Sequence, residues 1–294
     1  MHSPTMDLEL AYEACRTITR REAKNFYYAF LTLPAAKRRA IYAAYAFCRL
    51  CDDSVDEETS AESKLTALTD LKTNLQATYS GNSASPVYLA LADVAKHYYI
   101  PQDYFQEIIL GVESDLVKDR FANFEELREY CYRVASVVGL ICLQIFGYED
   151  DGAKEYAVDL GLAMQLTNII RDVREDLDMG RVYLPQDEMA QFGYTEEDLR
   201  NGVRNQAFQD LMRFQSQRAR EYFDRGFKLL PYLSRRSRAC PAVLGALYSK
   251  VLDRIEASDY DVLETRMSLS KAEKIRITAT TWLGSMLPIS APRR

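Results

Sequence analysis

Two stretches of this sequence carry acidic side chains at helical spacing. On a helix of about 3.6 residues per turn, four polar residues of the first stretch share one line: Gln165, Asn168, Asp172 and Asp176. Apolar residues flank this line on both sides, which is typical of a buried helix. Buried carboxylates must be paired or must bind a metal, because an isolated charge is costly away from water. A metal site and a salt-bridged helix surface with Arg171 and Arg174 are both compatible with this stretch alone.

The second stretch presents a comparable line. Its members advance by three or four residues at a time: Tyr42, Tyr45, Arg49, Asp52 and Asp56. If the two helices face each other across a pocket, their oxygen ligands suit Mg²⁺, which completes its coordination shell with phosphate oxygens and water. We therefore expect two to three Mg²⁺ ions held by Asp52, Asp56, Asn168, Asp172 and Asp176, with a diphosphate as the third component.

Such a site at the head of an apolar cavity favours ionisation of an allylic diphosphate. Metal ions would neutralise the leaving group, and four basic residues could hold further phosphate charge: Lys24, Arg49, Arg171 and Arg181. An ion-paired or solvated side chain is the alternative for each. The carbocation must be shielded from water and stabilised by aromatic faces. Tyr45, Tyr130, Tyr132 and Tyr260 are candidates, with ordinary core packing as the alternative.

The composition excludes several other classes of protein. The chain has 294 residues, a net charge of −6 and only two histidines, which argues against a nucleic-acid partner and against a histidine-rich metal site. Cys48 and Cys51 form a C-x-x-C pair inside an apolar helical pattern, so core packing is the favoured interpretation. No signal peptide is visible, and the apolar run 134–147 is too short to span a membrane. We expect a cytoplasmic protein.

Apolar periodicity predicts an all-α fold in one domain covering 1–294, with a core of about 8–287. The expected helices cover residues 7–33, 34–58, 61–80, 86–99, 101–118, 124–147, 151–179, 205–229, 237–257 and 268–286, with an extended loop at 180–185. Small residues in 130–139 suggest either close packing or room for a ligand.

The two acidic stretches carry a family resemblance. Tyr45-Ala-Phe-Cys-Arg49-Leu-Cys-Asp52-Asp-Ser-Val-Asp56-Glu and Gln165-x-x-Asn168-Ile-x-Arg171-Asp172-x-x-Glu175-Asp176 resemble the paired signatures of the squalene/phytoene synthase family, as does Gly180-Arg181-Val-Tyr183-Leu-Pro185. The resemblance covers about residues 8 to 270. It implies an all-α isoprenoid synthase fold that joins two prenyl diphosphates head to head through a cyclopropylcarbinyl diphosphate.

The resemblance also implies residue roles. Diphosphate contacts would be Lys24, Tyr45, Arg49, Gln165, Arg171 and Tyr260, with Tyr130, Arg181 and Tyr183 as further substrate-binding candidates. The chain tunnels would be lined by Phe26, Phe30, Val134, Val138 and Gly139. The catalytic set would be Tyr45, Arg49, Asp52, Asp56, Asp172 and Asp176. The string Glu22-Ala-Lys24-Asn departs from members that carry a histidine and serines there.

The length of the tunnel should select the substrate. Bulky Phe30 and Tyr42 favour two C15 farnesyl diphosphates and a C30 product, while the loop Tyr-Leu-Pro-Gln-Asp-Glu resembles phytoene synthases, which join two C20 chains. NADPH use cannot be read from the sequence. A non-catalytic assembly factor and a terpene cyclase are further alternatives. We expect a monomer whose segment 280–289 is either a peripheral membrane contact or an ordinary terminal helix.

Overall fold

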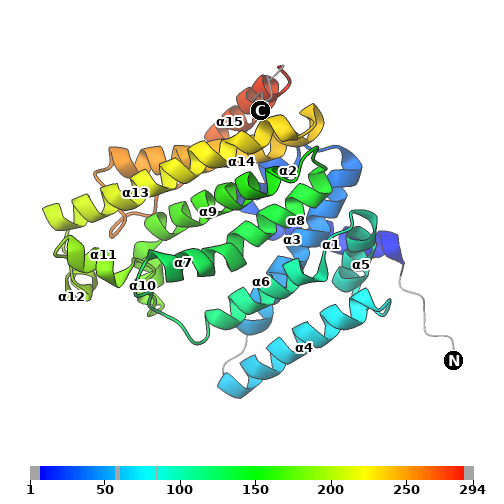
Figure 1. Cartoon of the computed structure of the whole chain (residues 1–294), viewed down its shortest axis with the longest axis horizontal. Helices are drawn as coiled ribbons and strands as arrows, with labels where there is room; N and C mark the ends of the chain where they lie inside the picture. The colour runs from blue at the N-terminus through cyan, green and yellow to red at the C-terminus, as the bar shows by residue number, and fades with distance from the viewer. Residues whose placement is uncertain (1–6, 57–59, 84, 288–294) are drawn as a thin grey trace.

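A computed structural model describes residues 7–56, 60–83 and 85–287, apart from the side chains of Lys24, Asn25 and Asp56. Its regular elements are helices (Figure 1). They are α1 (Leu8–Glu22), α2 (Lys24–Phe30), α3 (Ala35–Asp56), α4 (Ala61–Tyr79), α5 (Pro86–His97), α6 (Gln102–Ser114), α7 (Phe124–Cys131), η1 (Tyr132–Ser136), α8 (Val137–Phe146), α9 (Ala153–Arg171), α10 (Val173–Asp178), α11 (Gln186–Gln191), α12 (Glu196–Arg200), α13 (Gln206–Gly226), η2 (Phe227–Tyr232), α14 (Arg235–Ala257) and α15 (Lys271–Ser285). The predicted all-α fold is confirmed.

Two of the expected long helices are interrupted. The first breaks at Ala23, between α1 and α2, where ψ is −2°. The helix expected over 151–179 breaks at Asp172, whose φ of −101° and ψ of 17° end α9 and begin α10. The short helices α11 and α12 were not predicted. The break at Asp172 falls on the acidic line itself, so the last carboxylate of that line lies on a separate short helix.

The segment 124–146 is one continuous helix with a π-helical turn, η1, in its middle. The Ser136 hydroxyl in this turn donates a 2.8 Å hydrogen bond to the Val158 carbonyl of α9. Gly161 faces the same turn, and a Cβ there would lie 2.7 Å from Ser136 Cα. A Cβ at Gly139 would lie 2.8 Å from the Ala157 carbonyl oxygen. The small residues therefore allow close packing of this helix on α9.

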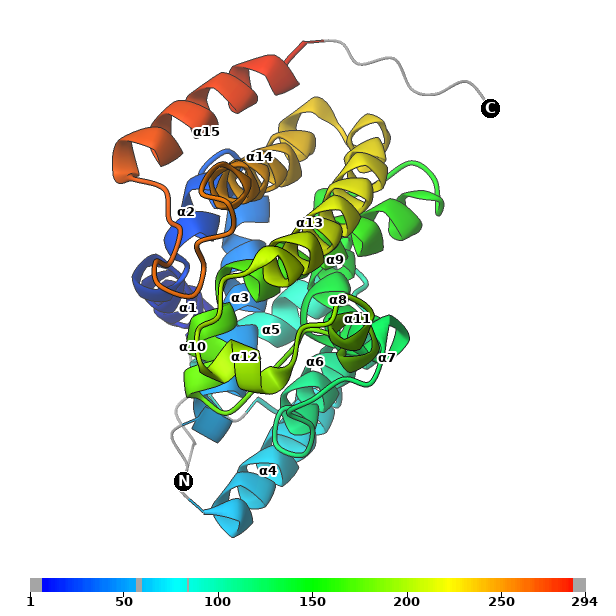
Figure 2. The same cartoon turned by 90° about the vertical axis from the view of Figure 1, so that its left-hand side faces the viewer.

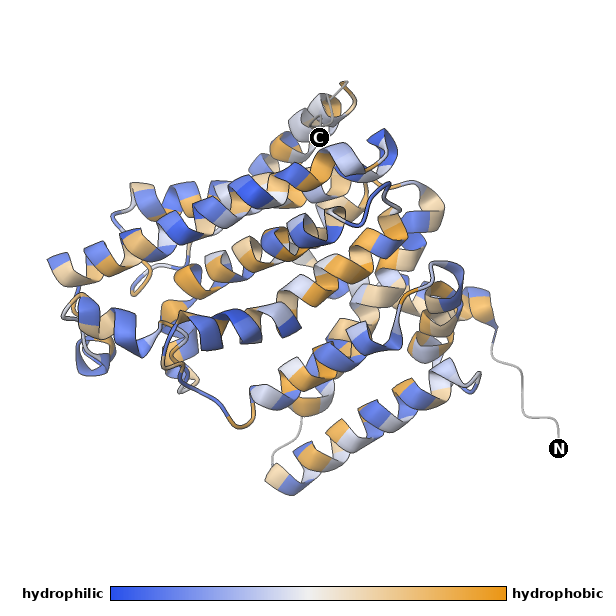
Figure 3. Cartoon of the chain, viewed as in Figure 1, coloured by the Kyte–Doolittle hydropathy of each residue, from blue (hydrophilic) through white to orange (hydrophobic). Residues whose placement is uncertain are grey.

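The same helix is long and apolar enough, at 23 residues, to cross a membrane by length and composition. The run 134–147, expected to be too short to span a membrane, lies largely in the second half of this helix. Half of its most apolar window is nevertheless buried, and the helix packs against α6 and α9. Figure 3 shows that hydrophobic residues dominate α8. Its apolar composition is accounted for by its place in the core.

The helices surround a central group formed by α3, α8, α9 and α14. Helix α13 packs along α9, while α1 and α5 pack on α3. Helices α4 and α15 lie at opposite outer edges of the molecule (Figures 1 and 2). The described residues include no β-strand, only isolated bridges between Arg120 and Val182 and between Tyr148 and Leu233. The Arg120 bridge ties the predicted 180–185 loop to the loop before α7.

We predict that Gly226→Ala destabilises the protein. A Cβ on Gly226 would lie 2.7 Å from Leu160 Cα, so α13 would have to move away from α9, at a cost of about 1–3 kcal/mol. Gly284→Ala is the matched control because nothing lies within 4 Å of its added Cβ, and it should stabilise α15 by about 0.5–1 kcal/mol. Urea unfolding measures both. Equal effects of the two substitutions would contradict this packing.

Candidate functional site

A cavity of about 290 Å³ lies between α2, α3, η1, α8, α9 and α14. The structure places in its wall the tunnel residues expected from the sequence: Phe26, Phe30, Val134, Val138 and Gly139. Most of the lining is apolar, and the polar residues gather on two walls. Asp52 and Tyr45 come from α3, whereas Gln165 and Asn168 come from α9. An apolar cavity with a few convergent polar groups is the usual form of a small-molecule site.

The polar line of α9 continues from this cavity to the surface. Gln165 and Asn168 also belong to a second, more open depression that includes Arg171, Asp172, Asp176 and Tyr183. The two depressions are therefore joined at Gln165 and Asn168. Among the described side chains, no three His, Cys, Asp or Glu residues lie close enough together to form a metal site by themselves, and the Asp56 side chain lies outside the described residues.

Asp172 is an ionised carboxylate between two arginines. Its carboxylate accepts two hydrogen bonds from Arg171, one of them 2.7 Å long, and a 2.9 Å bond from Arg266. Burial by itself raises the pKa of the Asp172 carboxyl, but Arg171 and Arg266 outweigh this effect and hold the pKa below its ordinary value. The Arg266 guanidinium also lies 3.0 Å from Glu175. The loop before α15 is therefore tied to the open depression around Arg171, Asp172 and Asp176, which we call the mouth of the cavity.

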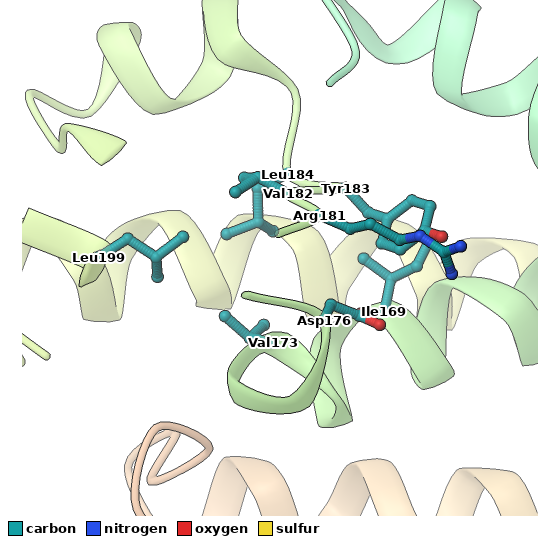
Figure 4. A pocket seen from close by; sticks show the side chains of 8 residues that line it. All are labelled: Ile169, Val173, Asp176, Arg181, Val182, Tyr183, Leu184 and Leu199. Carbon is teal, nitrogen blue, oxygen red and sulfur yellow. The ribbon is translucent and has the colours of Figure 1, made fainter. Parts of the chain in front are cut away.

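The pKa of Asp176 is shifted in the opposite direction from that of Asp172. Burial, followed by the negative charge of Asp172, raises the pKa of its carboxyl to about 7, despite the attraction of Arg181. Asp176, Arg181 and Tyr183 line a small pocket beside the mouth. Figure 4 shows the Asp176 carboxylate, the Arg181 guanidinium and the Tyr183 hydroxyl on the same side of this pocket. A carboxylate that is costly to ionise in the free protein gains most from a bound cation.

Asn168 provides a further test of fit to a metal. Its amide nitrogen donates a 3.1 Å hydrogen bond to Gln165, and the side chain lies close enough to the Tyr248 hydroxyl to offset part of the rise that burial causes in its pKa. Its buried Oδ1 has no hydrogen-bond partner among the described residues. A hard cation would satisfy this oxygen. The residues present therefore fit Mg²⁺, which Asn168, Asp172 and Asp176 on one wall and Asp52 on the other could hold.

The expected phosphate contacts are placed unevenly. Arg171 and Arg181 lie at the mouth. Arg49 is half-buried and forms an ion pair with Asp53, one turn along α3, while its Nε lacks a hydrogen-bond partner. The Lys24 side chain lies outside the described residues. Arg49 must leave Asp53, or share it, in order to contact a diphosphate.

Three of the tyrosines proposed from the sequence lie outside the cavity wall. Tyr260 has a left-handed backbone with φ of 60° and lies near Ser216 of α13, outside the lining of both depressions, so its diphosphate contact stays a prediction. Tyr132 lies on an outer groove. Tyr130 stacks on Tyr183 at 5.2 Å and donates to its hydroxyl at 3.3 Å. Tyr130 therefore contacts Tyr183, a residue of the mouth, and does not line the cavity itself.

Tyr42 also differs from its expected position. It stacks on Tyr27 at 6.3 Å with nearly parallel rings, and its ring also lies 6.2 Å from that of Phe30. Ile41, Ala44, Tyr45 and Cys48 take the lining positions of α3. Tyr42 therefore lies behind Phe30 and not in the lining itself. Phe30 does line the cavity.

Two residues of the site were missed from the sequence. Tyr248 of α14 lines the cavity, and its ring lies 6.0 Å from that of Phe26, which also approaches Phe30 and Tyr45 within 6.1 and 6.2 Å. Its place on one helix face with Pro241 and Leu244 was a signal that could have found it. Arg266 lies in an irregular loop, where spacing gives no signal.

We predict that Asp176→Asn stabilises the metal-free protein. The folded-state pKa of about 7 lies above the unfolded value of about 3.9, so wild-type stability is lost as the pH rises from about 4 to about 7. The variant should gain an advantage of about 1–3 kcal/mol by about pH 8, after discounting for partial exposure. Urea unfolding in a chelator at several pH values measures it.

Asp178→Asn, on the same helix but exposed, is the control and should show no such pH-dependent gain. Mg²⁺ should stabilise the wild-type protein more than Asp176→Asn. A pH-independent difference between Asp176→Asn and wild type would contradict the burial of this charge.

Comparisons with known proteins agree with this geometry. The family model described as squalene/phytoene synthase matches residues 19–273. The chain is 40% identical over 271 residues to the 15-cis-phytoene synthase of Synechococcus elongatus, covering 88% of each chain. It is 38% identical over 283 residues to the phytoene synthase of Mycobacterium tuberculosis, covering 95% of this chain and 93% of that one.

Solved structures show the same fold. A dehydrosqualene synthase matches with a TM-score of 0.87 and 28% identity, over 96% of this chain and 100% of the other. The squalene synthase HpnC from Alicyclobacillus acidocaldarius matches with a TM-score of 0.82 and 29% identity, over 86% and 95%. This chain belongs to the squalene/phytoene synthase family and is a prenyltransferase.

Proposed function

We propose that this enzyme joins two C20 geranylgeranyl diphosphates head to head, as a phytoene synthase of carotenoid biosynthesis. The support comes from relatives named phytoene synthase at 36–40% identity, matched over most of both chains. They favour the C20 alternative over the C15 preference drawn from the sequence. The absence of Tyr42 from the cavity lining weakens the argument for C15.

The observation that carries the proposal is the junction at Gln165 and Asn168. These side chains belong both to the charged mouth and to the apolar cavity. A molecule with a diphosphate head and a hydrocarbon tail has the same division. Its head would meet Arg171 and Arg181, and its tail would follow the wall formed by Phe26, Phe30 and Val138.

The residues divide the chemistry between them. Bound Mg²⁺ would supply positive charge to the departing diphosphate. The guanidinium groups at the mouth would bind the remaining phosphate oxygens. Tyr45, Tyr248, Phe26 and Phe30 would turn aromatic faces toward an allylic cation and exclude water from it. This cation would then alkylate the double bond of the second substrate, and loss of a proton from the resulting cation would close the ring of the cyclopropylcarbinyl diphosphate.

Two related expectations belong to this proposal. A product that forms by loss of a proton needs no hydride donor, so the C20 reaction should proceed without NADPH. All six cysteines are free thiols, which fits a reducing compartment and supports a cytoplasmic location.

We predict that the purified enzyme with Mg²⁺ converts geranylgeranyl diphosphate to a C40 hydrocarbon. Its kcat/KM should exceed that for farnesyl diphosphate by about tenfold or more, because each extra buried methylene contributes about 0.8 kcal/mol. Product mass spectrometry, with and without NADPH, identifies the product. A preference for the C15 substrate would overturn the proposal in favour of a C30 synthase, and a product from one diphosphate would indicate a cyclase.

We also predict that Tyr248→Phe lowers kcat/KM by about tenfold, because its hydroxyl lies beside Asn168 and Arg171 and one polar interaction of this kind contributes about 1–1.5 kcal/mol. Tyr260→Phe is the matched control. Its tyrosine is also buried but lies against α13, so activity should stay near the wild-type value. The reverse ranking of the two variants would contradict the site described above.

A further inference from the structure

Helix α15 exposes its apolar side to solvent. Ile275, Trp282 and Leu283 are 51%, 42% and 61% exposed, and Ala279 between them is exposed as well. Positions 275, 279, 282 and 283 share one face of a helix. A surface helix normally buries this face against the core, so α15 has the inverse arrangement.

The side of α15 that lies toward the bundle is largely polar. It is formed by Lys274, Ile277, Thr278, Thr281 and Ser285, all partly or fully buried. Of these, Ile277 packs against the core. The Thr278 hydroxyl is buried without a hydrogen-bond partner among the described residues. Apolar burial therefore contributes little to holding this helix in place.

Polar bonds to α14 hold α15 at both ends. At its N-terminal end, Arg254 pairs with Glu273, which also completes the capping box with Ser270. At its C-terminal end, the buried Arg238 donates to the Ser285 and Leu287 carbonyls at 2.8 and 2.6 Å. These bonds fix the rotation of the helix, so the outward direction of its apolar face is specified by the fold.

The charges around this face are basic. Lys271 and Arg276 are exposed on α15, and Arg235 and Arg236 are exposed at the end of α14 that Arg238 joins to α15. The acidic residue of α15, Glu273, is neutralised by Arg254. The chain as a whole carries a net charge of −6, so this local excess of basic groups runs against the overall charge.

The position of α15 links it to the cavity. It packs on α14 and α2, and these two helices supply Tyr248, Phe26 and Phe30 to the cavity wall. Leu31, directly after α2, is a further exposed apolar residue. Figure 2 shows α15 as the outermost helix on this side of the molecule.

We propose that the exposed apolar face of α15 docks the enzyme on an anionic lipid bilayer. A helix with tryptophan and leucine on one face and basic residues beside it binds at a membrane interface, and tryptophan favours that depth. The charge pattern selects a bilayer with acidic headgroups over a second copy of this acidic chain. In terms of the proposed function, on which this biological role rests, docking brings the cavity wall to the membrane that must receive a hydrocarbon product.

The test is flotation of the full-length, substrate-free protein with vesicles of phosphatidylcholine alone or mixed with phosphatidylglycerol. The wild-type protein should float with the mixed vesicles, and less so at high salt. The double variant Trp282→Ser, Leu283→Asn should bind about tenfold or more weakly, because two large side chains lose their apolar burial. Thermal unfolding should show both proteins equally folded.

Leu65→Asn is the matched control. Leu65 is 59% exposed on α4, at the opposite edge of the molecule (Figure 1), and its substitution should leave flotation unchanged. Equal binding by the double variant, or no binding by wild type, would overturn the proposal. So would a wild-type dimer in light scattering that the double variant dissociates. Turnover measured in detergent, without a bilayer, separates the membrane proposal from the proposed function. Failure to convert the C20 substrate in detergent would count against the proposed function alone.

Discussion

Asp172 and Asp176 lie beside the same cavity, yet their surroundings shift their pKa values in opposite directions. Arg171 and Arg266 keep Asp172 ionised against the effect of burial, whereas burial and the charge of Asp172 raise the pKa of Asp176 to about 7. Much of the fold serves this placement of charge. Close packing at Gly161 and Gly226 fixes α9, and the helix break at Asp172 directs the last carboxylate to the mouth. A bound cation would offset the cost of ionising Asp176 in this buried position.

Residues that obey helical periodicity could be predicted from the sequence. The polar line through Gln165 and Asn168, and Asp52 on a second helix, follow from spacing alone, whereas the cavity positions of Phe26 and Val138 were expected from the family resemblance. Spacing identifies which residues share a face. It does not identify which face turns inward when both sides of a helix are apolar. Tyr42 illustrates this limit, because it packs against Tyr27 and Phe30 and does not itself line the cavity.

Features set by irregular backbone could not be predicted in this way. Arg266 reaches Asp172 from a loop, and the positive φ of Tyr260 turns its ring toward α13. The inverse orientation of α15 depends on bonds from Arg238 and Arg254, which no local pattern reveals. In each case a contact between distant segments decides the position of a side chain, and local propensity contributes little.

The central claim is that carboxylates on two facing helices bind a diphosphate through Mg²⁺. Calorimetric titration of the substrate-free enzyme with inorganic diphosphate tests it most directly, because no turnover is involved. Binding should require Mg²⁺ and should weaken at least about tenfold in Asp52→Asn and in Asp172→Asn alike, since each removes one wall of the site. Equal diphosphate affinity without Mg²⁺, or an unchanged affinity in either variant, would contradict the account.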